Sequence, residues 1–314
     1  MTRSSALKLL HSLQLGPLAF AAMTTASCGA VPERPSSEHP TIVSLNPCTD
    51  AILAEVAAPG QLLAISHYSH DPQASSMPAA QAALYPATGG TAEEVLAIAP
   101  DMVVASSFIA PSTRAAFERA GVRVETVGIA QTLEDSVAQV RAMGVLAGEP
   151  QRAEALAQRI EAAWRAAKYS GAPVETLLWQ EGGIVPGANS LAAAMLEQSG
   201  FTLQSAARGL GQGAYLPLEQ VLADPPALVL ASGDEPMLTH PVLRQVQGME
   251  YQRFDSALLY CGGPTIIRAL ARLKKIRADV TPLPPAGGVG GGPAQPSLDF
   301  PTPRPPPAGG RGSA

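Results

Sequence analysis

The stretch EEVLAIAPDMVVAS, from Glu93 to Ser106, decides the fold because it recurs later in the chain as EQVLADPPALVLAS, from Glu219 to Ser232. The two stretches share Glu, Val, Leu, Ala, Pro, Val, Ala and Ser at matching places. In each, an acidic residue opens a short amphipathic helix, a proline ends it, and a β-branched run predicts a buried strand. The spacing is too long for a solenoid. The repeat therefore predicts two related α/β lobes, with a cleft between them that suits a small ligand.

The composition is that of a globular chain with a sizeable core. Hydrophobic residues make up 46% and charged residues 15%, and the net charge is −5. Binding to a nucleic-acid backbone needs a concentrated basic face, which this sequence does not have. We therefore expect no nucleic-acid partner.

Residues 1–30 are predicted to be a signal or lipoprotein leader. Arg3 and Lys8 precede a mostly apolar stretch from Leu9 to Met23, and small residues follow it. This stretch is interrupted and is shorter than the roughly 20 apolar residues of a membrane-spanning helix. Cys28 is a candidate for lipidation, although the usual Leu of a lipobox is missing. The alternatives are cleavage nearby with release into the periplasm, or a frayed N-terminus.

The two ends of the chain flank the folded region. Residues 31–40 form a polar linker, and more than half of the residues in the tail 281–314 are Pro or Gly. Such a tail cannot bury a core, so we expect it to be disordered. Between them, strand and helix patterns alternate in an N-terminal lobe, 41–131, and a C-terminal lobe, 171–280. Residues 132–170 have helical periodicity and predict one long helix with a kink or joint near Gly148.

Six segments, in this order, resemble the substrate-binding proteins of ABC importers for iron complexes and vitamin B12. They lie between Thr41 and Arg277 and read TIVSLNPCTDAIL, TAEEVLAIAPDMVVAS, IVPGANSLAAAMLEQSGF, YLPLEQVLADPPALVLAS, HPVLRQV and LLYCGGPTIIRAL. The resemblance implies an α/β fold of two Rossmann-like lobes joined by a single long interlobe α-helix, with the ligand cleft between the lobes. It also implies a periplasmic, monomeric protein that delivers its ligand to an ABC permease with its ATPase.

The same resemblance implies that Glu93 and Glu219 dock the protein on the permease, because such proteins are thought to present one exposed Glu on each lobe to permease arginines. A carboxylate in the first turn of a helix lies at the positive end of the helix dipole and stays ionised. It can form a bidentate pair with Arg. Glu94 is the neighbouring contender in the first lobe. The alternative is that these glutamates only favour the starts of their helices.

The ligand is expected where loops follow the carboxyl ends of the strands. These loops combine aromatic surfaces with hydrogen-bonding tips, which suits a large chelate or a corrin ring. The predicted ligand-binding residues are Asn46, Cys48, Ser66, His67, Tyr68, His70, Ser107, Trp179, Tyr215 and Tyr260.

Two pairs of residues leave alternatives open. His67 and His70 could contact a metal complex or lie in a plain hydrogen-bonded loop, and the few other histidines argue against a bare metal-ion site. Cys48 and Cys261 could form a disulfide across the cleft, contact the ligand, or remain two separate buried thiols.

The sequence carries no motif that predicts catalysis. There is no GxSxG, no HExxH, no phosphate loop and no GxGxxG at a strand-to-helix turn. A Cys48–His67 nucleophile is conceivable, but no third residue stands out to activate it. We therefore predict a binding protein without cofactor or enzymatic activity that captures cobalamin or a ferric siderophore. Haem, with His67 or Tyr68 as its axial ligand, is the alternative, followed by a free metal ion.

Overall fold

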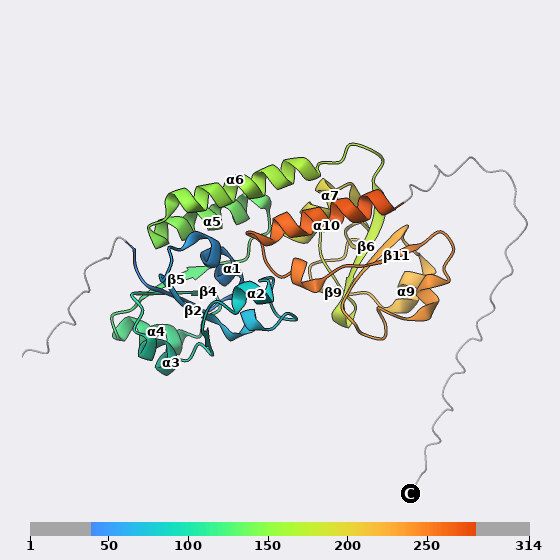
Figure 1. Cartoon of the computed structure of the whole chain (residues 1–314). Helices are drawn as coiled ribbons and strands as arrows, with labels where there is room; N and C mark the ends of the chain where they lie inside the picture. Colours follow the sequence, from blue (N-terminus) through green and yellow to red (C-terminus); the bar gives the residue numbers. More distant parts are fainter. Residues whose placement is uncertain (1–38, 281–314) are drawn as a thin grey trace, which may run out of the picture.

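A computed structural model describes residues 39–280 of the chain (Figure 1). The predicted leader with Cys28, most of the linker 31–40 and the tail 281–314 lie outside the described residues. Within 39–280, no helix is both long enough and apolar enough to cross a membrane.

The first lobe is built on a five-stranded parallel sheet with the order β3-β2-β1-β4-β5. Its central strand β1 pairs with β2 on one side and with β4 on the other. The strands are β1 (Ile42–Ser44), β2 (Leu62–Ser66), β3 (Ala87–Thr88), β4 (Met102–Ser106) and β5 (Arg123–Val127). The helices are α1 (Pro47–Val56), α2 (Ala79–Ala82), α3 (Ala92–Ile98) and α4 (Pro111–Arg119), with a 3-10 helix at His67–His70.

The second lobe is built on a mixed six-stranded sheet with the order β11-β10-β6-β7-β9, in which β8 also pairs with β6. β7 is antiparallel to both β6 and β9. The strands are β6 (Val174–Gln180), β7 (Ile184–Val185), β8 (Phe201–Leu203), β9 (Ala214–Tyr215), β10 (Leu228–Ser232) and β11 (Glu250–Arg253). The helices are α7 (Leu191–Gln198), α8 (Gln204–Ala207), α9 (Leu218–Ala223) and α10 (Thr265–Asp279), with 3-10 helices at Glu181–Gly183, Pro241–Arg244 and Ser256–Leu258.

The predicted long helix is two helices, α5 (Leu133–Ala147) and α6 (Pro150–Ala167). Gly148 ends α5 in the left-handed conformation, with φ of 71°, and Pro150 starts α6. The chain reverses at this point, so the helices lie side by side (Figure 1). Gly144 permits their close approach, because a Cβ there would lie 2.2 Å from the Cβ of Ala153. The prediction of one helix over 132–170 is therefore wrong in its length.

Helix α6 leads the chain from the first lobe to the second. Near its start, Arg152 Nε donates to the carbonyl of Val56 in the first lobe at 2.7 Å. Near its end, the carbonyl of Trp164 accepts from Gln198 Nε2 in the second lobe at 2.8 Å. One buried apolar cluster contains residues of both lobes together with α6, among them Ile42, Ile160 and Leu270. The lobes are thus held together by a shared core along α6.

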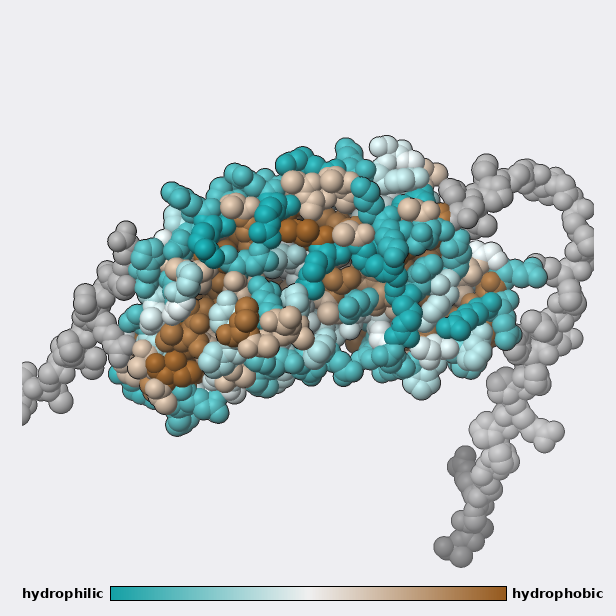
Figure 2. Space-filling view, in the orientation of Figure 1, coloured by the Kyte–Doolittle hydropathy of each residue, from teal (hydrophilic) through white to brown (hydrophobic). Residues whose placement is uncertain are grey.

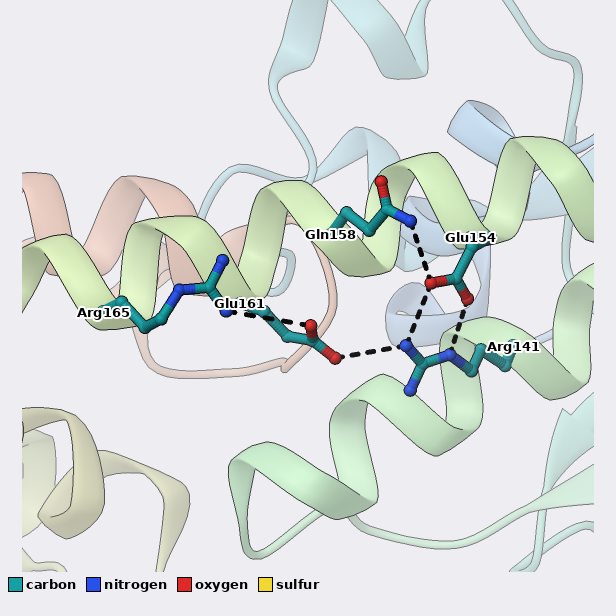
Figure 3. A network of polar contacts seen from close by, with 5 residues as sticks. All are labelled: Arg141, Glu154, Gln158, Glu161 and Arg165. Atoms are coloured by element: carbon teal, nitrogen blue, oxygen red, sulfur yellow. Dashed lines mark hydrogen bonds and ion pairs between the residues drawn. The ribbon is translucent and has the colours of Figure 1, made fainter.

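A polar network on the surface ties α5 to α6 (Figure 3). Arg141 Nε donates to Glu154 at 2.8 Å, and the same guanidinium lies 3.2 Å from Glu161. Gln158 and Arg165 extend the network along α6. These side chains are largely exposed to solvent, so the network orients the helix pair more than it stabilises it.

Candidate functional site

A cavity of about 470 Å³ lies between the lobes, at the carboxyl ends of their strands. The first lobe contributes residues that follow β1, β4 and β5, and the second lobe contributes the ends of β6 and β7 and the segment before α10. The lining residues are Asn46, Cys48, Thr49, Ser106, Phe108, Val127 to Gln131, Gln139, Gln180, Pro186, Asn189 to Ala192, Gln212 and Leu259 to Gly262. The predicted cleft between the lobes is therefore present, and its size is typical of small-molecule sites.

Amide side chains dominate the polar lining of this cavity. They come from both lobes and are Asn46, Gln131, Gln139, Gln180, Asn189 and Gln212. Among the described residues that line the cavity, none is Asp, Glu, Lys, Arg or His. The cavity therefore offers hydrogen-bond donors and acceptors without a formal charge.

Three of these amides also fix the shape of the cavity wall. Asn46 caps α1, because its Oδ1 accepts from the backbone N–H of Cys48 at 2.8 Å. Gln139 Nε2 donates to the carbonyl of Gly128 at 2.9 Å, and Gln212 Oε1 accepts from the N–H of Gly187 at 3.1 Å. Each amide keeps a second polar group that this bond does not use. The wall is thus held in place while hydrogen-bonding capacity remains for a ligand.

Apolar side chains surround the polar groups. Phe108 and Ile129 are strongly exposed, at 77% and 74%, although both are large apolar residues that line the cavity. Leu191, Ala192 and Leu259 line it from the second lobe. A flat apolar face of a ligand would cover this surface, which is costly to leave in water.

Three of the predicted ligand-binding residues line the cavity, namely Asn46, Cys48 and Tyr260. Ser107 does not, although its neighbours Ser106 and Phe108 do. Tyr215 lies on β9 outside the lining and is 61% exposed.

The prediction that Trp179 faces the ligand is wrong. Its side chain is fully buried in the core of the second lobe, and Nε1 donates to the carbonyl of Leu216 at 2.9 Å. Strand β6 is covered on both faces, so its aromatic residue packs inside the lobe while the next residue, Gln180, reaches the cavity.

The residues after β2 lie outside the cavity lining as well. Ser66 is buried, whereas His67, Tyr68 and His70 are exposed on the 3-10 helix. The rings of His67 and Tyr68 lie against each other with their centroids 4.0 Å apart, and His67 Nδ1 is 3.3 Å from the carbonyl of Thr88. The partners of both rings thus belong to the first lobe. Among residues 39–280, no group of three or more His, Cys, Asp or Glu side chains could hold a metal ion.

Buried Asp50 fixes this 3-10 helix. Its Oδ2 accepts from the backbone N–H of Ser66 at 3.0 Å and from the hydroxyl of Ser69 at 2.6 Å. Burial raises the pKa of the Asp50 carboxyl from its ordinary 3.8 to about 7, although the hydrogen bonds act in the opposite direction. The segment after β2 is therefore held by hydrogen bonds to a buried carboxyl, Asp50, that can take up a proton near neutral pH.

Cys48 and Cys261 form a disulfide between the lobes, with their Cα atoms 5.2 Å apart. Of the alternatives that the sequence left open, this one is found in the structure. Both cysteines line the cavity, so the bridge is part of its wall. Neither cysteine is free to act as a thiol ligand or a nucleophile in this form.

The sequence analysis missed the loop after β5 and the start of α7. Ile129, Gln131 and Asn189 line the cavity, yet no motif marks them. Their only signal was position, since residues 127–131 directly follow a predicted strand and residues 186–192 belong to one of the six family segments.

Both predicted docking glutamates are exposed in the first turns of equivalent helices, Glu93 on α3 and Glu219 on α9. Glu94 is engaged locally, because its Oε2 accepts from the N–H of Gly89 at 2.7 Å and from the hydroxyl of Thr88 at 3.1 Å. This geometry favours Glu93 over Glu94 as the group available to a partner.

The comparison with known structures gives the fold. The haem-binding protein RhuT from Roseiflexus sp. RS-1, in its apo form, has a TM-score of 0.63 at 22% identity, over 77% of this chain and 99% of that one. The haem-binding protein HutB of Vibrio cholerae has a TM-score of 0.62 at 18% identity, over 76% and 99% of the two chains. The vitamin B12-binding protein BtuF of Vibrio cholerae has 0.58 at 17% identity, over 76% and 97%.

The family is given by a separate comparison. No curated protein matches the chain. The model of the periplasmic binding protein family matches residues 42–259, which is more than half of the sequence and most of the two lobes. The chain therefore belongs to the periplasmic binding protein family, the substrate-binding components of ABC importers.

Proposed function

We propose that this protein captures an uncharged metal complex, with cobalamin as the first candidate, and delivers it to an ABC permease. The uncharged, amide-rich cavity between the lobes carries this proposal. Cobalamin presents amide side chains around a flat corrin ring, so it can exchange hydrogen bonds with Asn and Gln side chains without needing a counter-ion. A neutral ferric siderophore fits the same description.

An anionic ligand fits the cavity less well. Haem carboxylates and ferric catecholates are best bound by Arg or Lys, and neither residue lines the cavity in the described part of the chain. Haem remains the second candidate because RhuT and HutB, which share the fold, are haem-binding proteins. The predicted axial ligands, His67 and Tyr68, lie outside the lining, whereas Tyr260 lines the cavity and is a further candidate.

The rim of the cavity supports a ligand larger than the cavity itself. Phe108 and Ile129 together offer an exposed apolar surface on the first lobe, and Tyr260 lines the cavity from the second. A planar macrocycle would rest on these side chains while its polar edge met the amides. Such mixed sites orient a ligand by a few hydrogen bonds and bind it largely through apolar contact.

Delivery is proposed to depend on Glu93 and Glu219. Both are exposed, and the helices that carry them occupy equivalent places in the repeat. Figure 2 shows apolar surface on the part of the first lobe where α3 and α4 lie, and Leu96 and Ile98 of α3 are partly exposed there. An apolar surface beside an exposed carboxylate is typical of a protein–protein contact.

Export and anchoring are proposed to depend on the leader, with Cys28 as the acylated residue. We further propose that the mature protein works as a monomer. Expression in a lipoprotein-processing bacterium checks the anchor, since Cys28→Ala should move the protein from the membrane fraction to the soluble periplasmic fraction. Size-exclusion chromatography with light scattering checks the monomer.

Isothermal titration calorimetry of the mature protein tests the ligand. The probes are cyanocobalamin, haemin, a neutral ferric hydroxamate and zinc. Ala192 lines the cavity, so Ala192→Trp should fill it and weaken binding at least 100-fold. Ala271→Trp, on the exposed side of α10, is the matched control and should leave binding unchanged. Cyanocobalamin binding that survives Ala192→Trp would contradict the site, and saturation by haemin alone would contradict the preferred ligand.

A further inference from the structure

We infer that the Cys48–Cys261 disulfide locks the two lobes around the cavity, and that its reduction by a dithiol releases the lock and weakens ligand binding. The part of this inference that concerns affinity rests on the proposed function. The part that concerns the lobes rests on the structure alone.

The disulfide joins the two lobes at the cavity, where they would move apart if the cavity opened. Cys48 is the second residue of α1 in the first lobe, and Cys261 lies just before α10 in the second. The two are 213 positions apart in the sequence. The other connection between the lobes is α6 with its shared core, on the helical side of the molecule (Figure 1). The two lobes are therefore connected at two separate places, by the disulfide at the cavity and by α6 at some distance from it.

The disulfide belongs to a longer contact that we name the latch segment, Tyr260 to Arg268. This segment of the second lobe makes three hydrogen bonds to the first lobe and to α5, which packs against α1 of that lobe. Tyr260 Oη donates to the carbonyl of Gln73 at 2.6 Å, Gly263 N–H donates to Ser136 Oγ at 2.7 Å, and Arg268 donates to the carbonyl of Ser76.

Glycines let the latch segment approach the first lobe closely. A Cβ at Gly262 would lie 2.5 Å from Ser136 Oγ. Gly263 has φ of 59°, and a Cβ there would lie 2.8 Å from the side chain of Ile52. The backbone of the latch segment thus packs directly against α1 and α5. Its first three residues, Tyr260, Cys261 and Gly262, also line the cavity.

The latch segment without its disulfide is held by hydrogen bonds that each contribute little net stability, since water competes for the same groups. Separation of the latch would move the second-lobe wall of the cavity away from Asn46 and Phe108. If only the closed arrangement binds, the apparent dissociation constant rises in inverse proportion to the fraction of closed protein.

The thiol–disulfide exchange that reduces the bridge is expected to begin at one particular sulfur. Cys261 is 5% exposed, whereas Cys48 is partly exposed and lines the cavity. A dithiol reductant would attack the sulfur of Cys48 and release Cys261 as a thiolate that takes up a proton. The second thiol of the reductant then displaces Cys48, so two electrons and two protons reach the protein and the reductant becomes a cyclic disulfide. A ligand in the cavity would cover Cys48 and hinder the first step.

Hydrogen–deuterium exchange with mass spectrometry tests the lock on the oxidised protein, the dithiothreitol-reduced protein and Cys48→Ser/Cys261→Ser. Reduction should speed exchange at least tenfold in the latch segment and in residues 71–77, and the double variant should match the reduced protein. Strands β4 and β10 should be unchanged. Equal protection in the oxidised and reduced proteins would overturn the inference. Should the double variant fail to fold, the reduced wild-type protein still decides the matter.

Two controls separate the disulfide from its neighbours. Ser136→Ala removes one latch hydrogen bond and keeps the disulfide, so it should change exchange in the latch segment less than threefold. Dithiothreitol added to the double variant should have no further effect, which excludes action of the reductant elsewhere.

Cyanocobalamin serves as the probe for affinity. It should bind the reduced protein about tenfold more weakly than the oxidised protein, and linkage requires it to favour the disulfide over the dithiol by the same factor at equilibrium. Equal binding to both forms would overturn the effect on affinity. If cyanocobalamin binds neither form, the proposed ligand fails, and the exchange experiment still decides whether the disulfide locks the lobes.

Discussion

The two lobes contain the same helix–strand unit, yet they use its ends differently. In the first lobe the unit is α3 and β4, and in the second it is α9 and β10. The buried valines match: Val95 and Val221 on the helices are fully buried, as are Val103 and Val229 on the strands. The strands end differently, because Ser106 lines the cavity whereas its counterpart Ser232 is buried. The repeat therefore preserves the packing of the unit and leaves the strand ends free to diverge.

The sheets also differ beside their central strands. In the first lobe, β2 runs parallel along β1. In the second, β8 pairs with the beginning of β6, and the antiparallel β7 pairs with its end at Gln180. This antiparallel insertion brings Pro186, Asn189 and Gln212 into the cavity wall. Part of the site thus comes from a region of the second lobe that the repeat does not contain.

The largest expected effect comes from the matched valines. Val103→Asp and Val229→Asp each bury an unpaired carboxylate at equivalent positions, so each should lower the free energy of unfolding by about 4 kcal/mol or more. Urea denaturation measures this. Val145→Asp, at a position that is 72% exposed, is the control and should cost less than about 1 kcal/mol. Tolerance of Asp at only one of the two strand positions would break the equivalence of the lobes.

Asp50 gives the first lobe a pH dependence that the second lobe does not share, because no other carboxylate is buried among the described residues. The pKa of Asp50 is raised by burial from 3.8 to about 7. The folded protein therefore holds a proton that the unfolded chain has lost, and the stability contribution is highest below pH 4. It should fall by about 1.4 kcal/mol per pH unit as the pH rises from 4 to 7 and then level off.

Asp50→Asn removes this titration while keeping an acceptor for Ser66 and Ser69. The free energy of unfolding of wild type minus that of the variant, measured by urea denaturation between pH 4 and 8, should fall across this window. A constant difference would show that Asp50 does not titrate there, and a rising one would mean that its folded-state pKa is lowered.

Sequence reasoning predicted the elements whose signals are local. The repeat gave α3, β4, α9 and β10 because a proline and a β-branched run act within a few residues. The break between α5 and α6 was visible at Gly148, but whether the chain kinks or reverses depends on the contact of Gly144 with Ala153, which no local pattern contains.

The site was predicted less well, for two physical reasons. In a sheet covered on both faces, alternation does not tell which residue at a strand end turns outward, so Trp179 was assigned to the cavity although only its neighbour Gln180 lines it. The loop after β2 shares an edge of the sheet with the cavity, but Asp50 and the His67–Tyr68 contact hold it outside the lining. The burial of Trp179 and the position of the loop after β2 both depend on tertiary contacts, which no local sequence pattern contains.

Charge reversal at the proposed docking residues tests whether both lobes contact the permease. Glu93→Lys and Glu219→Lys should each weaken stimulation of the permease ATPase by about tenfold, or about 1.4 kcal/mol, because one Arg–carboxylate pair is replaced by repulsion. Ligand affinity should not change, since neither residue lines the cavity. Reconstituted proteoliposomes give the ATPase rate. Glu134→Lys, another exposed first-turn glutamate, is the control and should have no effect. If only one of the two variants lowered the ATPase stimulation, only the lobe that carries that residue would contact the permease.

The smallest expected effect concerns the helices that pack against α6 in the two halves. In the first lobe this neighbour is α5, tied to α6 by the exposed Arg141 network (Figure 3). In the second it is α10, whose Leu270 and Leu273 are buried in the shared core. Arg141→Met should therefore cost less than about 1 kcal/mol, whereas Leu273→Ala should cost about 2–5 kcal/mol. Urea denaturation compares them at low and high salt, and only the effect of Arg141→Met should shrink with salt, because screening weakens exposed ion pairs. A cost for Arg141→Met that equals that of Leu273→Ala would mean that the surface network, rather than the apolar core, holds the first lobe to the bridging helix.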